Sequence, residues 1–168
     1  MSRQLYRVEN TASPAAAAGA PVTTGTSVKT LLQLLHPSMT LSVVEWGISF
    51  DGSAAGTPIK CELIHTTTVA ATVTAFGAND VVLFTDPTGN TPGLTLSTSG
   101  SGFTASAEGT VVAPVRVGDY EQVAPTNQYL KQFPLDQEFV VPAAGVLRVR
   151  VTAAAAVNAV CHVLFGVG

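Results

Sequence analysis

Short segments in which apolar and polar residues alternate constrain the fold of this chain more than any other feature of its sequence. In residues 40–50 (TLSVVEWGISF) the alternation places Val44, Trp46, Ile48 and Phe50 on one face. A period of two residues is that of a β-strand, in which successive side chains point to opposite faces. Because nothing except the ambiguous stretch KTLLQLL allows a helical period, the sequence predicts an all-β fold.

The last thirty residues contain the clearest alternation. Residues 146–152 (VLRVRVT) place apolar side chains on one face and Arg148 and Arg150 on the other. Residues 157–165 (VNAVCHVLF) alternate as well and are apolar on much of both faces, which is typical of a central strand. Because only residues 153–156 separate these segments, we expect the two to form an antiparallel hairpin.

Weaker strand signals occupy much of the remaining chain. They lie at residues 59–65, 81–84, 94–96, 109–117 and 129–133. The Ser/Gly/Thr-rich stretch 97–110 is expected to be a long surface loop. A series of about eight to ten short strands separated by turns predicts an antiparallel β-sandwich or jelly roll.

The first 27 residues differ in composition from the rest of the chain. Prolines, a run of alanines and a polar Thr/Ser stretch predict an extended N-terminal arm (1–27) ahead of the sandwich domain (28–168). Such a segment has little apolar surface with which to order itself, so we expect a neighbouring subunit, or the arm's own domain, to hold it. The candidate contact residues of the arm are Arg3, Leu5, Tyr6, Arg7 and Val8.

Charged residues are scarce, at 11% of the 168 residues against 46% hydrophobic residues. A soluble domain usually carries about 25% charged residues. Since the buried centres of protein interfaces are depleted in Lys and Glu, one interpretation is a surface that meets other subunits. The alternative is the residue bias of a GC-rich genome, which also enriches Ala, Gly and Val.

The sign and placement of the charges argue against nucleic acid as a partner. The net charge is −3, and the Lys and Arg residues are scattered rather than gathered into a patch. No apolar run approaches the ~20 residues that span a bilayer, and the N-terminus lacks the apolar core of a signal peptide. We therefore expect neither nucleic acid nor membrane among the partners.

No combination of residues predicts catalysis. His36, His65 and His162 lack the spacing of a metal site, and no G-x-S-x-G motif occurs. Cys61 and Cys161 are interpreted as buried small hydrophobic residues rather than as a disulfide or as zinc ligands. The sequence thus predicts no enzyme, no metal, no cofactor and no small-molecule substrate.

The arginines of residues 146–152 offer one candidate contact outside the arm. Arg148 and Arg150 form a positive stripe on one strand face, where they could clamp a carboxylate of a neighbouring subunit. The alternative is a solvated sheet face, since exposed charges are common there. Both interpretations place the two side chains on the surface.

Several stretches resemble small virion proteins of tailed bacteriophages. They are KTLLQL at 29–34, EWGISFDG at 45–52, YLKQFPL at 129–135, residues 138–142 and GVLRVRVTA at 145–153, followed by Val157 and Asn158. The resemblance covers roughly residues 28–165 and consists of strand patterns. Its members are jelly-roll-like capsid decoration or head-accessory proteins, often trimeric, that sit on the outside of the capsid.

This resemblance implies a structural role rather than a chemical one. It implies binding to the major capsid protein, association into a homotrimer, and synthesis in the host cytoplasm before incorporation into the virion. Two alternatives remain open at this stage. One is another virion component, such as a tail-tube or head-fibre subunit, and the other is a carbohydrate-binding jelly roll that recognises a host surface.

Overall fold

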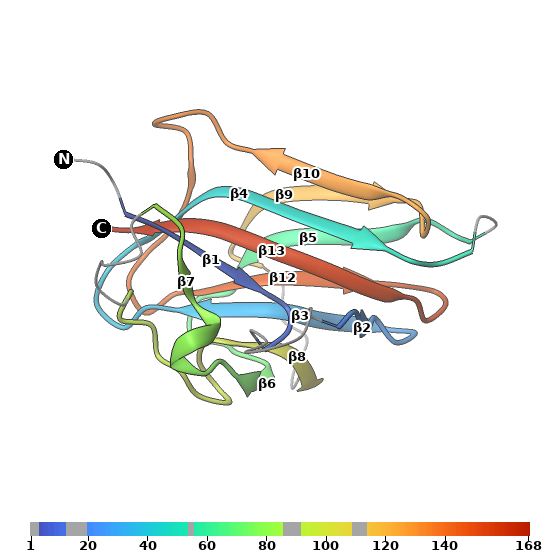
Figure 1. Ribbon diagram of the computed structural model, residues 1–168, viewed down its shortest axis with the longest axis horizontal. Coiled ribbons are helices and arrows are strands. Elements are labelled where there is room, and N and C mark those ends of the chain that lie inside the picture. Colours follow the sequence, from blue (N-terminus) through green and yellow to red (C-terminus); the bar gives the residue numbers. More distant parts are fainter. Residues whose placement is uncertain (1–3, 13–19, 54–55, 86–91, 109–113) are drawn as a thin grey trace.

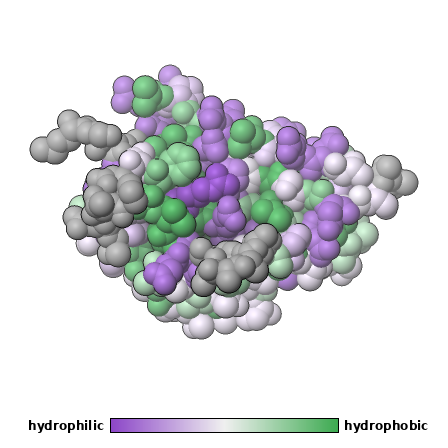
Figure 2. Space-filling model, viewed as in Figure 1, coloured by the Kyte–Doolittle hydropathy of each residue, from purple (hydrophilic) through white to green (hydrophobic). Residues whose placement is uncertain are grey.

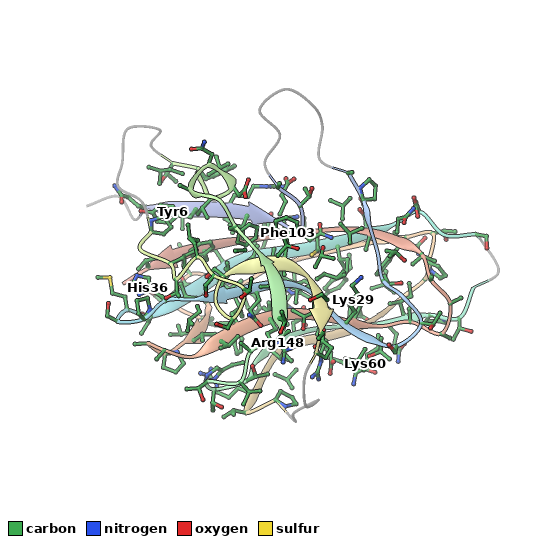
Figure 3. The ribbon with its side chains drawn as sticks, turned by 90° about the horizontal axis from the view of Figure 1, so that it is seen from below. Tyr6, Lys29, His36, Lys60, Phe103 and Arg148 are labelled. Atoms are coloured by element: carbon green, nitrogen blue, oxygen red, sulfur yellow. The ribbon has the colours of Figure 1, made fainter. Side chains whose placement is uncertain are left out.

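Two antiparallel β-sheets pack face to face in the computed structural model, which describes residues 4–12, 20–53, 56–85, 92–108 and 114–168. The predicted all-β sandwich is therefore confirmed, whereas the jelly-roll path within that class remains a prediction. Figure 3 shows the two layers from the side, with Tyr6 on one sheet and Arg148 and Lys60 on the other.

The sheet nearer the viewer in Figure 1, sheet A, has the strand order β10-β4-β13-β1-β7. β11 also pairs with β4, and β2 with β13. The strands are β1 (Leu5–Glu9), β2 (Val22–Thr23), β4 (Leu41–Phe50), β7 (Val82–Leu83), β10 (Gln128–Gln132), β11 (Phe139–Val141) and β13 (Asn158–Val167). The long strands β4 and β13 pair along nearly their whole length and form the centre of the sheet.

Sheet B has the order β6-β8-β3-β12-β5-β9. Its strands are β3 (Val28–Leu35), β5 (Ile59–His65), β6 (Thr72–Ala75), β8 (Gly102–Ala107), β9 (Arg116–Val123) and β12 (Val146–Thr152). A short 3-10 helix, η1 (Ala78–Asp80), precedes β7. The ambiguous stretch KTLLQLL is thus strand β3, which pairs with β12 across the middle of the sheet.

The core lies between the sheets and is anchored by Trp46, which is fully buried on β4. Its indole Nε1 donates a hydrogen bond to the carboxylate of Asp119 on β9, at 3.0 Å, and Tyr129 donates to the same oxygen at 2.9 Å. Asp119 therefore ties an edge of sheet B to two strands of sheet A. Burial raises the pKa of Tyr129 to about 12, helped by this hydrogen bond to Asp119, so its phenol stays a donor at neutral pH.

The expectation that the N-terminal residues form only an arm is wrong for residues 5–9. They form β1, which pairs along its whole length with β13 and also contacts β7. Tyr6 and Val8 alternate inward and are only 3% and 1% exposed. Alternation over five residues is too short to stand out in the sequence, but it is enough to fill a place in the sheet between two strands.

The predicted hairpin between residues 146–152 and 157–165 is also wrong. β12 lies in sheet B between β3 and β5, whereas β13 lies in sheet A between β4 and β1. The connection at residues 153–157 crosses from one sheet to the other. Both strands still turn their apolar residues toward the same core, so the inward faces agree with the alternation and only the pairing differs from the expectation.

Two local departures from the expected pattern involve a bulge and a missed strand. The register of β4 against β13 shifts so that Glu45 and Val43 pair with consecutive residues, which leaves Val44 as a β-bulge and turns Val43 inward instead. The stretch expected to be a loop, 97–110, contains β8, which pairs with β3 and β6. Apart from Phe103 this strand consists of small residues, so its sequence shows no alternation of large apolar and polar residues.

Candidate interaction face

The outer face of sheet A carries a cluster of polar side chains drawn from four strands. We call this surface the sheet A face and define it by Arg7 and Glu9 (β1), Glu45 (β4), Leu130 and Gln132 (β10), His162 (β13), Val82 (β7) and Val140 (β11). Strands far apart in the sequence contribute to it, because β4 and β13 lie side by side with β1 and β10 flanking them.

Glu45 lies at the centre of this cluster. Its carboxylate accepts a hydrogen bond from Gln132 Nε2 at 2.6 Å and contacts His162 Nε2 at 3.0 Å. Partial burial raises the pKa of Glu45, but the hydrogen bonds from Gln132 and His162 and the charges of His162 and Arg7 outweigh it, so the pKa is lowered overall. Glu45 is therefore a fixed negative charge at neutral pH.

The position of His162 depends on the absence of a side chain at residue 47. A Cβ at Gly47 would lie 2.7 Å from His162 Cε1 and 3.0 Å from Leu130 Cδ1. Both distances are shorter than van der Waals contact, so a side chain at residue 47 would displace the imidazole and the leucine from their places over β4. Gly47 thus allows His162 to reach Glu45.

Exposed aliphatic side chains flank the polar cluster. Leu130 is 58% exposed, Val82 49% and Val140 37%. Figure 2 shows this side of the molecule, with strongly hydrophilic side chains across its middle and hydrophobic ones on either side. A patterned surface of this kind, with aliphatic contacts around fixed charges, can recognise a protein surface of complementary shape and charge.

Of the candidate contact residues in the arm that the structure describes, Leu5 and Arg7 lie on the outward side of β1, and Arg7 belongs to the sheet A face. Its guanidinium lies 3.3 Å from Glu9. Tyr6 and Val8 belong to the core instead, which corrects their assignment as partner contacts, and Leu5 is half-buried. Arg3 lies outside the described residues. A strand with alternate residues in the core leaves only the intervening side chains free to meet a partner.

The assignment of Arg148 and Arg150 as exposed partner contacts is wrong as well. Both are buried, Arg148 being only 1% exposed, and both pair with carboxylates of this same chain. They do point to the outer face of sheet B, but other parts of the chain cover that face around them. Each therefore already has a carboxylate partner within the chain.

Arg148 belongs to a hydrogen-bonded network beside the register shift between β3 and β12. Its Nη2 lies 2.8 Å from Glu108 Oε2, and its Nε donates to Thr30 Oγ1 at 3.1 Å. Glu108 also accepts hydrogen bonds from the hydroxyl and the backbone N–H of Thr30, where the β3–β12 register shifts. Glu108 therefore satisfies both the buried cation and a backbone donor at the bulge.

Arg150 belongs to a second, neighbouring network. Its Nε lies 3.0 Å from Glu62 Oε2, and Lys60 Nζ lies 2.9 Å from Glu62 Oε1. The Lys60 ammonium also lies 5.5 Å from the centre of the Tyr120 ring, within the range of a cation–π contact. One carboxylate thus serves two cations, and the network ends at the exposed ring of Tyr120.

The two cysteines are placed unfavourably for nucleophilic chemistry. Cys61 and Cys161 are free and buried, and burial raises the pKa of Cys61 to about 12, so its thiol is protonated at neutral pH. Burial also raises the pKa of Cys161. Within the described ranges, no group of three or more His, Cys, Asp and Glu side chains could hold a metal ion.

A pocket of about 400 Å³ opens at one end of the sandwich, between the turns that follow β4 and precede β13. Its one carboxylate, Asp51, accepts hydrogen bonds from the backbone N–H and the side-chain amide of Asn158, both at 3.0 Å. Asp51 therefore holds two chain segments together. Nothing in this lining resembles a nucleophile beside a base.

His65 is a buried histidine whose ring nitrogens both lack a hydrogen-bond partner among the described residues. It lies at the end of β5 and is 5% exposed. Burial lowers the pKa of His65, and the nearby charge of Arg116 lowers it further. The neutral ring is therefore the form that the folded protein accommodates.

This burial predicts a loss of stability in mild acid. Because the folded-state pKa of His65 lies below its unfolded value of about 6.5, the unfolded chain takes up a proton first as the pH falls. The free energy of unfolding should be constant above that pH and decline below it, by at most about 1.4 kcal/mol per pH unit. Urea denaturation at pH 7.5, 6 and 5 measures the slope. A His65→Leu variant should have a flatter profile, and an unchanged slope would contradict the assignment.

In comparisons with known proteins, no family model, no curated protein and no solved structure matches the chain. In the part of the chain that is described, no helix has the length and apolar character needed to cross a membrane.

Proposed function

We propose that this chain is a non-catalytic structural subunit of a bacteriophage virion, which decorates the capsid by binding the major capsid protein through the sheet A face. The observation that carries the proposal is the arrangement of that face, with exposed Leu130, Val82 and Val140 around a fixed Glu45 charge. The resemblance of its strand patterns to phage head-accessory proteins supports the major capsid protein as the partner. Binding of this kind requires no active site.

The distribution of charge supports an assembly role. The chain has only eight Lys and Arg residues, and Arg148 and Arg150 are buried in internal ion pairs. The exterior is therefore poorer in charge than the composition alone indicates. At the same time, large apolar side chains such as Leu135, Phe84 and Val115 are exposed. A surface of this character is suited to being covered by other subunits.

The rigidity of the sheet A face supports the same role. Leu130 and Gln132 lie on β10, and the remaining members lie on strands of the same sheet. Contacts presented by paired strands are held in place before binding, so little conformational entropy is lost when a partner docks. A decoration protein repeats such a modest contact at every symmetry-related position of the shell, and the sum stabilises the shell.

Rebinding to stripped capsids tests the proposal. Capsids freed of the protein with a chaotrope are mixed with purified wild-type protein or with a Leu130→Asp/Val82→Asp variant, and the bound copies are counted after sedimentation. The wild-type protein should rebind. The variant places two charges in the contact, so we expect its affinity to fall by about tenfold or more.

A Met39→Asp variant is the matched control, because Met39 is 48% exposed but lies in the turn before β4 and not on the sheet A face. It should rebind as the wild type does. Failure of the wild-type protein to bind capsids would refute the proposal, and binding to purified tails or to a glycan array instead would favour the tail or carbohydrate alternatives. Equal losses in all variants would exclude the sheet A face.

A further inference from the structure

β9 forms one edge of sheet B, and its second edge has no strand beside it among the described residues. The strand is eight residues long, Arg116–Val123, and lies on the same side of the sandwich as β10 (Figure 1). An edge strand of this length presents unpaired backbone N–H and C=O groups, which favour pairing with another strand. Natural proteins usually cover such an edge or pair it.

A β-bulge decides which side chains of β9 share a face. The register against β5 shifts between Leu63 and Ile64, which leaves Gly118 as the extra residue. Arg116 consequently lies on the same face as Glu121, although the two are five residues apart. On a regular strand an odd separation would place them on opposite faces.

The contacts of β9 confirm this assignment of faces. Asp119 reaches inward to Trp46 and Tyr129, and Arg116 lies over the Phe139 ring of sheet A at 5.1 Å. Glu121 pairs with the inward-facing Cys61. Val117 and Tyr120 point outward and are 53% and 47% exposed.

We propose that β9 pairs in antiparallel fashion with β9 of a second copy of this chain across a two-fold axis, with Arg116 opposite Glu121 and Val117 opposite Tyr120. Residues that face one another in an antiparallel pair lie on the same face of the sheet, and this register satisfies that condition for both pairs. The two-fold axis makes each pair occur twice. Two cross-strand ion pairs and two apolar pairs would then join the sheets B of both copies into one continuous sheet.

Charge selects this register over its neighbours. A register centred on Glu121 places Glu121 opposite Glu121, and one centred on Tyr120 places Glu121 opposite Asp119; like charges directly opposite one another repel. A register with Arg116 opposite Asp119 would compete with the hydrogen bonds that Asp119 receives from Trp46 and Tyr129. Only Arg116 opposite Glu121 pairs opposite charges without disturbing the core.

A charge swap tests the pairing in the purified, full-length protein. Sedimentation velocity over a concentration series should show a reversible dimer for the wild type. Glu121→Arg places two cations opposite one another at both ends of the contact, so the dissociation constant should rise by on the order of tenfold or more. The combined Arg116→Glu/Glu121→Arg variant restores opposite charges and should return the dissociation constant to within about threefold of the wild type.

Glu9→Arg is the matched control, because it makes the same change of charge on the sheet A face and should leave the dimer intact. Thermal unfolding of every variant separates loss of pairing from loss of fold, which matters because Arg116 Nη1 donates to the backbone oxygen of Val140 at 2.8 Å. A wild-type protein that stays monomeric up to about 100 µM would overturn the proposal. A trimer whose dissociation constant does not change in Glu121→Arg would overturn it as well. Neither result would bear on capsid binding.

Cross-linking tests the register independently of the charges. A Val117→Cys/Tyr120→Cys chain should form a covalent dimer through two symmetric disulfides on oxidation, whereas Val117→Cys alone should not. The two new cysteines are three residues apart on an extended strand and are too far from each other to bridge within one chain. Monomers on a non-reducing gel after oxidation would exclude the register.

Discussion

Replacing Glu108 with alanine should lower the free energy of unfolding by about 3–5 kcal/mol, because the change leaves the guanidinium of Arg148 buried without a carboxylate. Arg148 is 1% exposed, and burial lowers its pKa against the opposing influence of Glu108. The folded protein can neither hydrate this cation nor deprotonate it at neutral pH. The backbone N–H of Thr30 loses its acceptor as well, which adds to the cost.

Chemical denaturation of three variants measures this prediction. Glu9→Ala removes a carboxylate that pairs with an arginine on the partly exposed sheet A face, and it should cost no more than about 1 kcal/mol. The double variant Glu108→Ala/Arg148→Met removes both buried charges and should recover most of the loss. A Glu108→Ala protein as stable as Glu9→Ala would show that water or a rearranged loop satisfies Arg148.

Deleting residues 1–10 should leave the chain unable to fold. The deletion removes β1 from the interior of sheet A, together with Tyr6 and Val8, and burying an aromatic or Val side chain typically contributes about 1.5–3 kcal/mol. It also removes the fully buried Asn10, whose amide donates to Ala159 O and whose side-chain oxygen accepts from Cys161 N. The sum approaches the roughly 5–15 kcal/mol total stability of a domain.

Circular dichroism and size-exclusion chromatography of the deleted chain test this expectation. Single variants give a graded measure: Tyr6→Ala should destabilise by about 3 kcal/mol or more, and Arg7→Ala, on the solvent side of the same strand, by no more than about 1 kcal/mol. A peptide of residues 1–12 added to the deleted chain should restore part of the native signal. A deleted chain that folds cooperatively would show that β1 is dispensable.

The alternation of the sequence located the strands well wherever it ran for seven residues or more. β4, β5, β12 and β13 begin and end within two residues of the expected segments, because an inward apolar face must recur at every second residue. The pattern does not name a strand's neighbour. β12 and β13 were therefore expected to pair, although the structure places them in opposite sheets.

The environment of the arginines could not be predicted from the sequence. The alternation correctly placed Arg148 and Arg150 on the outer face of β12, but an outer face is exposed only if nothing else covers it. Their partners, Glu108 and Glu62, are 40 and 88 residues away along the chain. The β-bulges at Val44 and Gly118 could not be predicted for a related reason. A bulge is an extra residue relative to the paired strand, so it cannot be located until that partner is known.

The pairing of β1 with β13 has a consequence for how the protein is made. Leu5 lies opposite Gly166 and Glu9 opposite His162, so β1 is translated long before the strand that it pairs with along its whole length. β4 also pairs with β13, so the edge of β4 that does not face β10 stays unpaired until β13 has been translated. Sheet A can therefore be completed only after translation has passed residue 167, and closing such a long loop is slow. Until then the apolar side chains of Tyr6 and Val8 and one edge of β4 lack their partners, so we expect the nascent chain to expose surface of the kind that chaperones bind.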